Sequence, residues 1–269
     1  MKPRLPPYFD GLIAAYHHGQ VGRFVHLGAW DAPPSEAELA APGAFERAQE
    51  RLNDRLLALA ELGDGQRVVD VGCGFGGTLA VVDARCLGMA LCGINIDARQ
   101  LAVCQGIRPR TGNMLRWLLA DACALPLADA SVDRLLCFEA MFHFESRRRF
   151  FRQAARVLAP GGRLVISDIV LRADPGDPAD DVTKRTVVAG FGPWPDFWSA
   201  DADHRVLAAA AGLACTLEVD ATQATLPSHV FTASAGAAAH DPVGSAAAAL
   251  AGLHRAGRLC YPLMCFVRH

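Results

Sequence analysis

The spacing of hydrophobic residues changes near residues 63 and 171 and divides the chain into three parts. Residues 1–62 have helical spacing: Ser35 and Glu38 are placed as in a capping box, and an amphipathic pattern predicts a long helix over 45–62. Short runs rich in β-branched residues then predict strands at 67–71, 90–96, 117–120, 132–138 and 163–170. Helical patterns at 78–87, 99–107 and 147–158 lie between them.

Strands separated by helices of this length predict an α/β fold with right-handed crossovers and a doubly wound, mostly parallel sheet. The alternation stops in 171–200, a stretch rich in Pro, Asp and Gly. An ordered loop this long is uncommon, so we expect a lid insertion after the fifth strand. Further strands at 213–219 and 259–267 complete a seven-stranded sheet. The predicted organisation is an N-terminal helical cap over 1–62, a core over 63–170, and the lid with the C-terminal strands over 171–269.

Composition supports a globular chain and excludes some partners. Hydrophobic residues make up 52% of the 269 residues and charged residues 20%, which allows a sizeable buried core. A formal net charge of −2 gives no general attraction for nucleic acid or an anionic membrane. The densest basic run, 147–149, is expected to be a solvated helix face. The sequence does not indicate an oligomeric state.

Nine cysteines occur without a Cys-x-x-Cys pair, which argues against a zinc or disulfide framework and suits a reducing compartment. No metal site is therefore expected. Residues 1–7 lack the continuous apolar stretch of a signal peptide, and no run of about 20 apolar residues predicts a spanning helix. We expect a soluble, cytoplasmic protein.

The most informative motif is the glycine-rich loop from Asp70 to Thr78, directly after the first predicted strand. Gly72, Gly74 and Gly77 fit G-x-G-x-x-G, the dinucleotide fingerprint, which is weak evidence alone. The same loop also fits D-x-G-x-G-x-G. A dinucleotide would place its pyrophosphate on the helix N-terminus, whereas a carboxylate at Asp70 suits an ammonium group better.

The second pattern resembles motif I of the class I S-adenosylmethionine-dependent methyltransferases. Segments 93–100, 121–133 and 158–162 resemble further motifs of this family in the same order, so the resemblance covers 68–170 and implies a Rossmann-like methyltransferase core. Most members have an acid where Asn95 stands, but the branch with the cyclopropane-fatty-acid synthases has a neutral residue there and a Gln where Gln100 stands. The resemblance implies that Asn95 and Gln100 hold the ribose, with Asp97 as the fallback, and that Asp121 accepts from the adenine amino group. The implied cofactor-binding residues are His26, Asp70, Gly72, Cys73, Gly74, Gly76, Asn95, Ile96, Gln100, Asp121, Ala122 and Phe138.

The segment from Glu139 to His143 resembles the E-(S/A)-x-x-H motif of small-molecule methyltransferases such as the rebeccamycin sugar O-methyltransferase. The resemblance implies that His143 is a general base, and the near-neutral pKa of histidine fits that role. It further implies that Glu139 supports the site or contacts the methionine part of the cofactor, and that Asp168 orients His143. A packed histidine that only braces the loop is the alternative.

Residues 26–30 resemble the H-x-G-x-W segment of sterol and tocopherol methyltransferases, which precedes the core. Aromatic side chains there and in the predicted lid suggest an acceptor pocket formed by Tyr8, Trp30, Phe142, Phe191, Trp194 and Trp198. The expected function is methyl transfer from S-adenosylmethionine to a small hydrophobic or aromatic natural product or metabolite, with O-methylation favoured. C- or N-methylation, an NAD(P)-dependent oxidoreductase and a non-catalytic cofactor-binding protein remain open.

Overall fold

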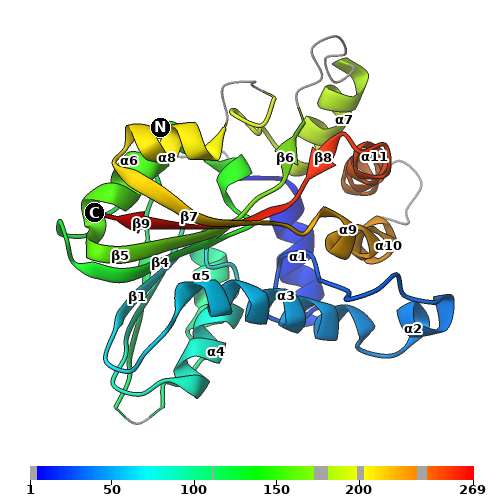
Figure 1. The fold of residues 1–269 in the computed structure, drawn as a ribbon. Helices are drawn as coiled ribbons and strands as arrows, with labels where there is room; N and C mark the ends of the chain where they lie inside the picture. Colours follow the sequence, from blue (N-terminus) through cyan, green and yellow to red (C-terminus); the bar gives the residue numbers. More distant parts are fainter. Residues whose placement is uncertain (1–4, 111, 173–180, 199–202, 235–240) are drawn as a thin grey trace.

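The computed structural model describes residues 5–110, 112–172, 181–198, 203–234 and 241–269 (Figure 1). In this part of the chain, seven strands form one sheet in the order β3-β2-β1-β4-β5-β9-β7. The strands are β1 (Arg67–Val71), β2 (Ala90–Asn95), β3 (Met114–Leu119), β4 (Val132–Phe138), β5 (Leu158–Ser167), β7 (Leu213–Asp220) and β9 (Pro262–Arg268). The first five run parallel, and β9 runs antiparallel to both β5 and β7. The predicted mostly parallel seven-stranded sheet is confirmed.

Helices cover both faces of the sheet because successive strand residues point to opposite sides. On β1, Val68 packs into a cluster with Leu52 of α3 (Ala44–Ala60) and Leu79 of α4 (Gly77–Arg85). Val69 faces the other way, into a cluster with Phe150 of α6 (Arg147–Val157). Figure 1 shows α3 and α4 on one side of the sheet, and α6 with α8 (His204–Ala210) on the other. The sheet is therefore doubly wound, as predicted.

Helix starts follow from local capping. Ser35 and Glu38 form the predicted capping box at α2 (Glu36–Ala40). Ser146 caps α6, and Asp97 caps α5 (Ala98–Cys104). Two strands begin earlier than predicted: β3 at Met114, and β5 at Leu158, which pairs with Val132 before the register shifts. The motif segment 158–162 therefore lies inside β5.

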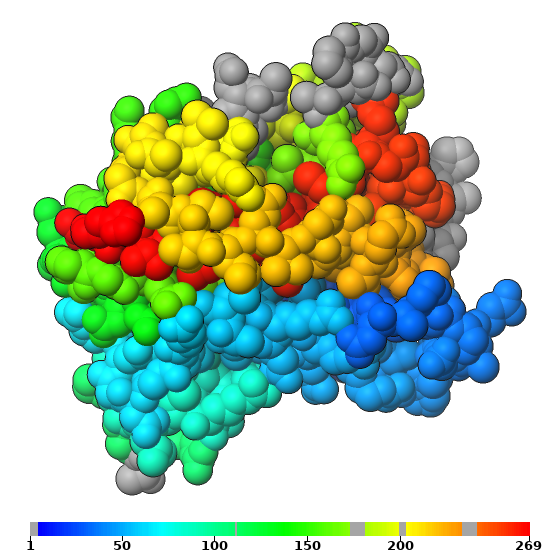
Figure 2. Space-filling view, in the orientation of Figure 1, coloured from blue at the N-terminus to red at the C-terminus, as the bar shows by residue number. Residues whose placement is uncertain are grey.

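The C-terminal part adds an outer layer at one end of the sheet. Beside β7 and β9 it contains α7 (Asp181–Phe191), α9 (Thr222–Thr225), α10 (His229–Ser234), α11 (Pro242–Arg255), and a small ladder of β6 (Val170–Leu171) with β8 (Leu259–Cys260). Figure 1 shows α7, α10 and α11 near α1 (Tyr8–His17), and Figure 2 shows this orange and red layer lying on blue N-terminal residues. Backbone N–H groups of Gly28 and Trp30 donate to Ser228 and Ala224 across this boundary.

The predicted lid is described only in part, because residues 173–180 and 199–202 lie outside the described ranges. Its described helix, α7, lies against α11: a Cβ at Gly190 would come within 2.4 Å of the Pro242 carbonyl oxygen. Whether this segment opens and closes stays a prediction. Within the described ranges, no helix combines the length and apolar character needed to cross a bilayer.

The last strand should carry a large share of the stability. Phe266 on β9 is fully buried, with its ring centroid 5.6 Å from that of Phe151. We expect Phe266→Ala to lower the free energy of unfolding by about 3–5 kcal/mol, measured by urea denaturation, because it leaves a cavity between β9 and α6. The matched control is Val219→Ala on β7, whose side chain is 44% exposed and should cost about 0.5 kcal/mol or less. Equal costs would contradict this account of the core.

Candidate active site

The glycine-rich loop makes a tight turn between β1 and α4. Gly72, Gly74 and Gly76 all have positive φ angles, of 81°, 52° and 78°, which residues with a Cβ rarely adopt. A Cβ on Gly72 would also lie 2.4 Å from the Cβ of Ala140, just after β4. The loop is thus held directly against the residues that follow β4, where Glu139 and His143 stand.

Residues 23–26 lie across this loop and enclose it. Arg23 Nη1 donates to the Phe75 carbonyl at 3.0 Å, and a Cβ on Gly74 would lie 2.5 Å from Val25 Cγ2. The space left is a cavity of about 20 Å³, whose lining includes His26, Asp70, Gly72, Cys73 and Phe138. A cavity of this size holds about one water molecule. We therefore expect residues 23–26 to move away from the loop when a nucleotide binds.

His26 and Asp70 give this cavity an electron-rich lining. The His26 ring donates from Nδ1 to the Leu27 carbonyl at 2.7 Å, and burial lowers the pKa of His26 to about 4, so the neutral ring carries a lone pair on Nε2. That atom is buried with no partner among the described residues. Burial also raises the pKa of Asp70 to about 7. An ammonium group placed between them would satisfy both, as predicted for the methionine part of the cofactor.

Asn95 and Gln100 come together as predicted. Asn95 Nδ2 donates to Gln100 Oε1 at 3.1 Å, and Asn95 Oδ1 accepts from the Asp97 backbone at 3.0 Å. Gln100 Nε2 is buried with no partner among the described residues, so it is available to a ribose hydroxyl. Asp97 is occupied instead, because it caps α5 and pairs with Arg99. Ile96 lies half-buried between them.

The predicted adenine-binding residues follow β3 and lie close to the sheet edge. Asp121 accepts from the Cys123 backbone at 2.8 Å with Oδ1 and is half-buried, and Ala122 is buried. Asp121 and Asn95 lie at the carboxyl ends of the neighbouring strands β3 and β2, as expected for a nucleotide in an open parallel sheet.

Glu139 joins three distant parts of the chain. Its backbone is left-handed, with φ 51°, and its N–H donates to the Ser167 carbonyl at 2.9 Å. Its Oε2 accepts from the Leu27 backbone at 2.9 Å and from the Tyr261 hydroxyl at 2.6 Å. Burial raises the pKa of Glu139 to about 7, against the lowering effect of these hydrogen bonds. The carboxylate therefore has a supporting role in the structure, as the sequence suggested.

His143 lies at the centre of an aromatic cluster. Its Nε2 is 2.9 Å from the Tyr8 hydroxyl, and its Nδ1 is buried with no partner among the described residues. Burial lowers the pKa of His143 to about 3, so the ring is neutral near pH 7. Phe142 and Trp194 lie against it, with ring centroids 4.6 and 5.8 Å from that of His143, and Phe191 lies 5.3 Å from Tyr8.

Two predicted pocket residues lie outside this cluster. Trp30 is stacked 6.1 Å from Phe231, beside α10, and Arg51 lies over its ring. Trp198 packs edge-on against Phe197, with Lys184 over its ring. Four of the six predicted pocket aromatics, Tyr8, Phe142, Phe191 and Trp194, are thus brought together around His143.

Asp168 has other partners than the predicted one. Its Oδ2 is 2.7 Å from Arg147 Nη2 and 2.9 Å from His204 Nε2, and all three residues are buried. Burial alone would raise the pKa of Asp168, but the charge of Arg147 and the hydrogen bond from His204 hold it below its usual range. In the described structure Tyr8, and not Asp168, is hydrogen-bonded to His143. The expected solvated face of residues 147–149 is also wrong for Arg147, whose side chain is fully buried.

The sequence could have revealed some of the residues that were missed. Arg147 shares helical spacing with Phe150, Phe151 and Ala154, which places it on the buried face of α6. Tyr261 directly precedes β9, and because β9 is antiparallel its first residues lie beside the carboxyl end of β5, at the functional edge of the sheet. His204 offered no comparable signal. No group of His, Cys, Asp and Glu within the described ranges is arranged to hold a metal ion.

Comparison with known proteins assigns this site to a family. A methyltransferase-domain model matches residues 69–166, which include the loop, Asn95, Asp121 and Glu139. Methyltransferase GfsG of Streptomyces halstedii is 42% identical over 170 residues, 62% of this chain and 56% of that protein. O-methyltransferase rstn1 of Aspergillus nomiae is 35% identical over 164 residues, 60% of this chain and 69% of that protein. The chain belongs to the S-adenosylmethionine-dependent methyltransferases.

This membership makes S-adenosylmethionine, and not a dinucleotide, the cofactor of the chain. The chain matches 56% of GfsG and 69% of rstn1, so each relative has sequence beyond the matched region. Among solved structures, the [4+2]-cyclase SpnF superposes with a TM-score of 0.73 at 22% identity, over 97% of this chain and 93% of that one. At this identity the likeness concerns the fold, and one fold can support different chemistries.

The buried carboxyl of Asp70 should cost stability in a pH-dependent way. Because burial raises the pKa of Asp70 in the folded state, proton binding at Asp70 favours the folded state. This contribution to the free energy of unfolding is fully present below the pKa of the unfolded state, and it is lost as the pH rises through about 7. Asp70→Asn stays neutral, so its stability relative to the parent protein should rise by about 2–3 kcal/mol between pH 5 and pH 8. Urea denaturation at both pH values measures this difference. A constant difference would show that Asp70 titrates as an ordinary surface acid.

The pairing of Arg147 with Asp168 should be structurally essential. Arg147→Met leaves the buried Asp168 charge without its main partner, and we expect a loss of about 3–5 kcal/mol in the free energy of unfolding. The control is Arg149→Met in the same helix, whose exposed pair with Glu145 should contribute about 1 kcal/mol or less. If the two variants unfold at the same urea concentration, Arg147 is not the buried partner described here.

Proposed function

We propose that this protein transfers the methyl group of S-adenosylmethionine to a hydroxyl oxygen of a small apolar acceptor. The observation that carries this proposal is the neutral ring of His143, buried with its Nδ1 unpartnered in the described structure and surrounded by aromatic side chains. The name of rstn1, an O-methyltransferase, supports the same reaction class.

The binding residues divide into two groups. Asp70 and His26 would hold the cofactor's amino group, Asn95 and Gln100 its ribose, and Asp121 its adenine. When bound, S-adenosylmethionine supplies a methyl carbon activated by a sulfonium. The acceptor would lie on the other side, against Phe142, Trp194 and Tyr8, where apolar walls exclude water and hold the hydroxyl in line with the methyl group.

His143 would take the acceptor's proton. The proposal requires the tautomer in which Nε2–H donates to the Tyr8 oxygen, 2.9 Å away, so that Nδ1 carries the lone pair. His143 Nδ1 would accept the hydroxyl proton when the acceptor oxygen takes up the methyl group that bound S-adenosylmethionine supplies. The low pKa of His143 keeps that lone pair available near neutral pH, although it makes the ring a weak base. Asp168 would supply the negative charge that stabilises the imidazolium, since its charge raises the pKa of His143 against the effect of burial.

The cofactor assignment is tested first, by calorimetric titration of the protein with S-adenosylhomocysteine and, separately, with NAD. We expect binding of S-adenosylhomocysteine alone. Methyl transfer is then screened with labelled S-adenosylmethionine against apolar alcohols, phenols, amines and alkenes. Labelled ethers support O-methylation, whereas labelled amines or branched alkenes alone would replace it with N- or C-methylation. Binding without transfer to any class would favour a non-catalytic protein.

The role of His143 is tested by His143→Ala. We expect turnover to fall by about 10²–10⁴-fold, since a general base contributes that much, while affinity for S-adenosylhomocysteine stays unchanged. The matched control is His17→Ala, an exposed histidine at the end of α1, which should leave both values unchanged. Unchanged turnover in His143→Ala would remove the general-base assignment and leave His143 as a packing residue.

A further inference from the structure

A second cavity lies on the C-terminal side of the site, separate from the cavity at the glycine-rich loop. Its apolar walls include Leu27, Ile169 and Leu259, and its polar walls include His229 and Tyr261. The volume is about 10 Å³, enough for a group the size of one water molecule or one hydroxyl. Residues 23–26 line the cavity at the glycine-rich loop, and Leu27 lines the second cavity. The short segment 23–27 therefore lies between the two cavities.

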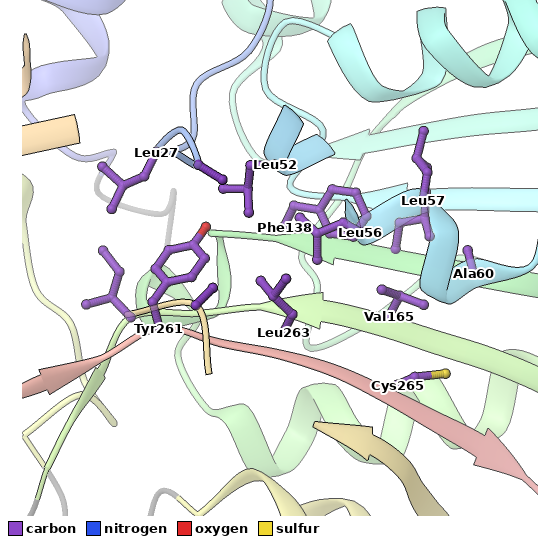
Figure 3. Packing of buried hydrophobic residues seen from close by; sticks show 14 of the residues in the cluster. Leu27, Leu52, Leu56, Leu57, Ala60, Phe138, Val165, Tyr261, Leu263 and Cys265 are labelled. Atoms are coloured by element: carbon purple, nitrogen blue, oxygen red, sulfur yellow. The ribbon is translucent and has the colours of Figure 1, made fainter. Parts of the chain in front are cut away.

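The second cavity adjoins the residues at the centre of the site. Leu27 and Tyr261 both line it, and both donate a hydrogen bond to Glu139 Oε2. Figure 3 shows the Tyr261 ring beside Leu27, on the side of the sheet that also carries Phe138. The Tyr261 hydroxyl donates to Glu139 and also lies 3.2 Å from Ser167 Oγ, so its hydrogen bonds are already made within the protein.

Hydrogen bonding fixes the tautomers of the two histidines in its wall. His254 Nε2 is 2.8 Å from the Thr222 carbonyl, which can only accept, so His254 carries its proton on Nε2. Burial lowers the pKa of His254, and lowers that of His229 to about 4, so both rings are neutral near pH 7. His254 Nδ1 must therefore accept from His229 Nε2, at 2.9 Å.

This chain leaves a lone pair on His229 Nδ1. His229 is 7% exposed, and Nδ1 is buried with no partner among the described residues. A buried acceptor without a hydrogen bond is costly, which is why such atoms call for a ligand or a water. The wall of the cavity thus includes one buried acceptor without a partner in the described structure, His229 Nδ1, and it suits a hydrogen-bond donor.

We propose that this cavity binds a second hydroxyl group of the methyl acceptor, with His229 Nδ1 accepting its hydrogen bond. The inference rests on the proposed function and narrows its substrate class to apolar molecules with at least two hydroxyl groups, one at His143 and one anchored at His229. A carboxylate is disfavoured here, since its oxygens would face the lone pair of His229 Nδ1.

The first experiment measures the His229 tautomer by ¹⁵N NMR of histidine-labelled protein at pH 7, with His229→Asn used for assignment. We expect an unprotonated Nδ1 and a protonated Nε2. A proton on Nδ1, or a doubly protonated ring, would overturn the proposal. The protein carries no nucleotide in this experiment, so the result holds whether or not methyl transfer is found.

The second experiment titrates protein with and without S-adenosylhomocysteine against three probes: cyclohexanol, methoxycyclohexane and cyclohexanecarboxylate. Cyclohexanol should shift the His229 Nδ1 resonance and bind about fivefold more tightly than the ether, since one net hydrogen bond separates them. The carboxylate should leave that resonance unshifted. Equal affinity for alcohol and ether, or no shift with cyclohexanol, would overturn the proposal.

A matched pair of variants locates the effect on Nδ1. His229→Gln places an amide where Nε2 stood and keeps a partner for His254, but leaves nothing at the Nδ1 position, so the fivefold preference should disappear. His229→Asn keeps a side-chain oxygen near the Nδ1 position and should retain the preference. If His229→Gln still binds cyclohexanol more tightly than the ether, the proposal is overturned. If the parent protein does not bind S-adenosylhomocysteine, the proposed function is contradicted instead. The tautomer of His229 does not depend on that outcome.

Discussion

The hydrogen bonds to the Glu139 carboxylate hold the parts of the site together. Glu139 follows β4, Leu27 belongs to the N-terminal segment, and Tyr261 precedes β9, so one buried oxygen joins residues more than a hundred positions apart. Its raised pKa reflects the cost of burying that carboxyl. The left-handed backbone conformation of Glu139 adds to this cost. Backbone strain of this kind is found most often at functional sites.

This arrangement explains why the site is closed in the described structure. Leu27 is fixed to Glu139, and the residues before it cover the glycine-rich loop. We expect a cofactor at this loop to compete with the chain's own N-terminal segment, so its binding free energy has to offset the contacts that it displaces. The same segment separates the nucleotide side from the acceptor side, so the two ligands are coupled through one element.

Much of the fold could be predicted from sequence, because alternation of β-branched runs and amphipathic helices is a local signal. The glycine-rich loop follows from the spacing of its glycines after a predicted strand, whereas Asn95, Gln100 and His143 are expected from the resemblance to the methyltransferase family. The partner of His143 could not be predicted, because Tyr8 lies in a separate N-terminal helix and only tertiary packing brings it there. The charge of Arg147 led to the prediction of a solvated side chain. The helical spacing of its apolar neighbours would have placed it correctly on the buried face of α6.

We propose above all that the cavity at the glycine-rich loop is the cofactor site and that residues 23–26 move to admit the cofactor. A crystal structure of the protein with S-adenosylhomocysteine tests this proposal most directly. We expect the amino group beside Asp70 and His26, the ribose on Asn95 and Gln100, and residues 23–26 displaced from the loop. A nucleotide bound elsewhere, or bound with these residues unmoved, would contradict the account.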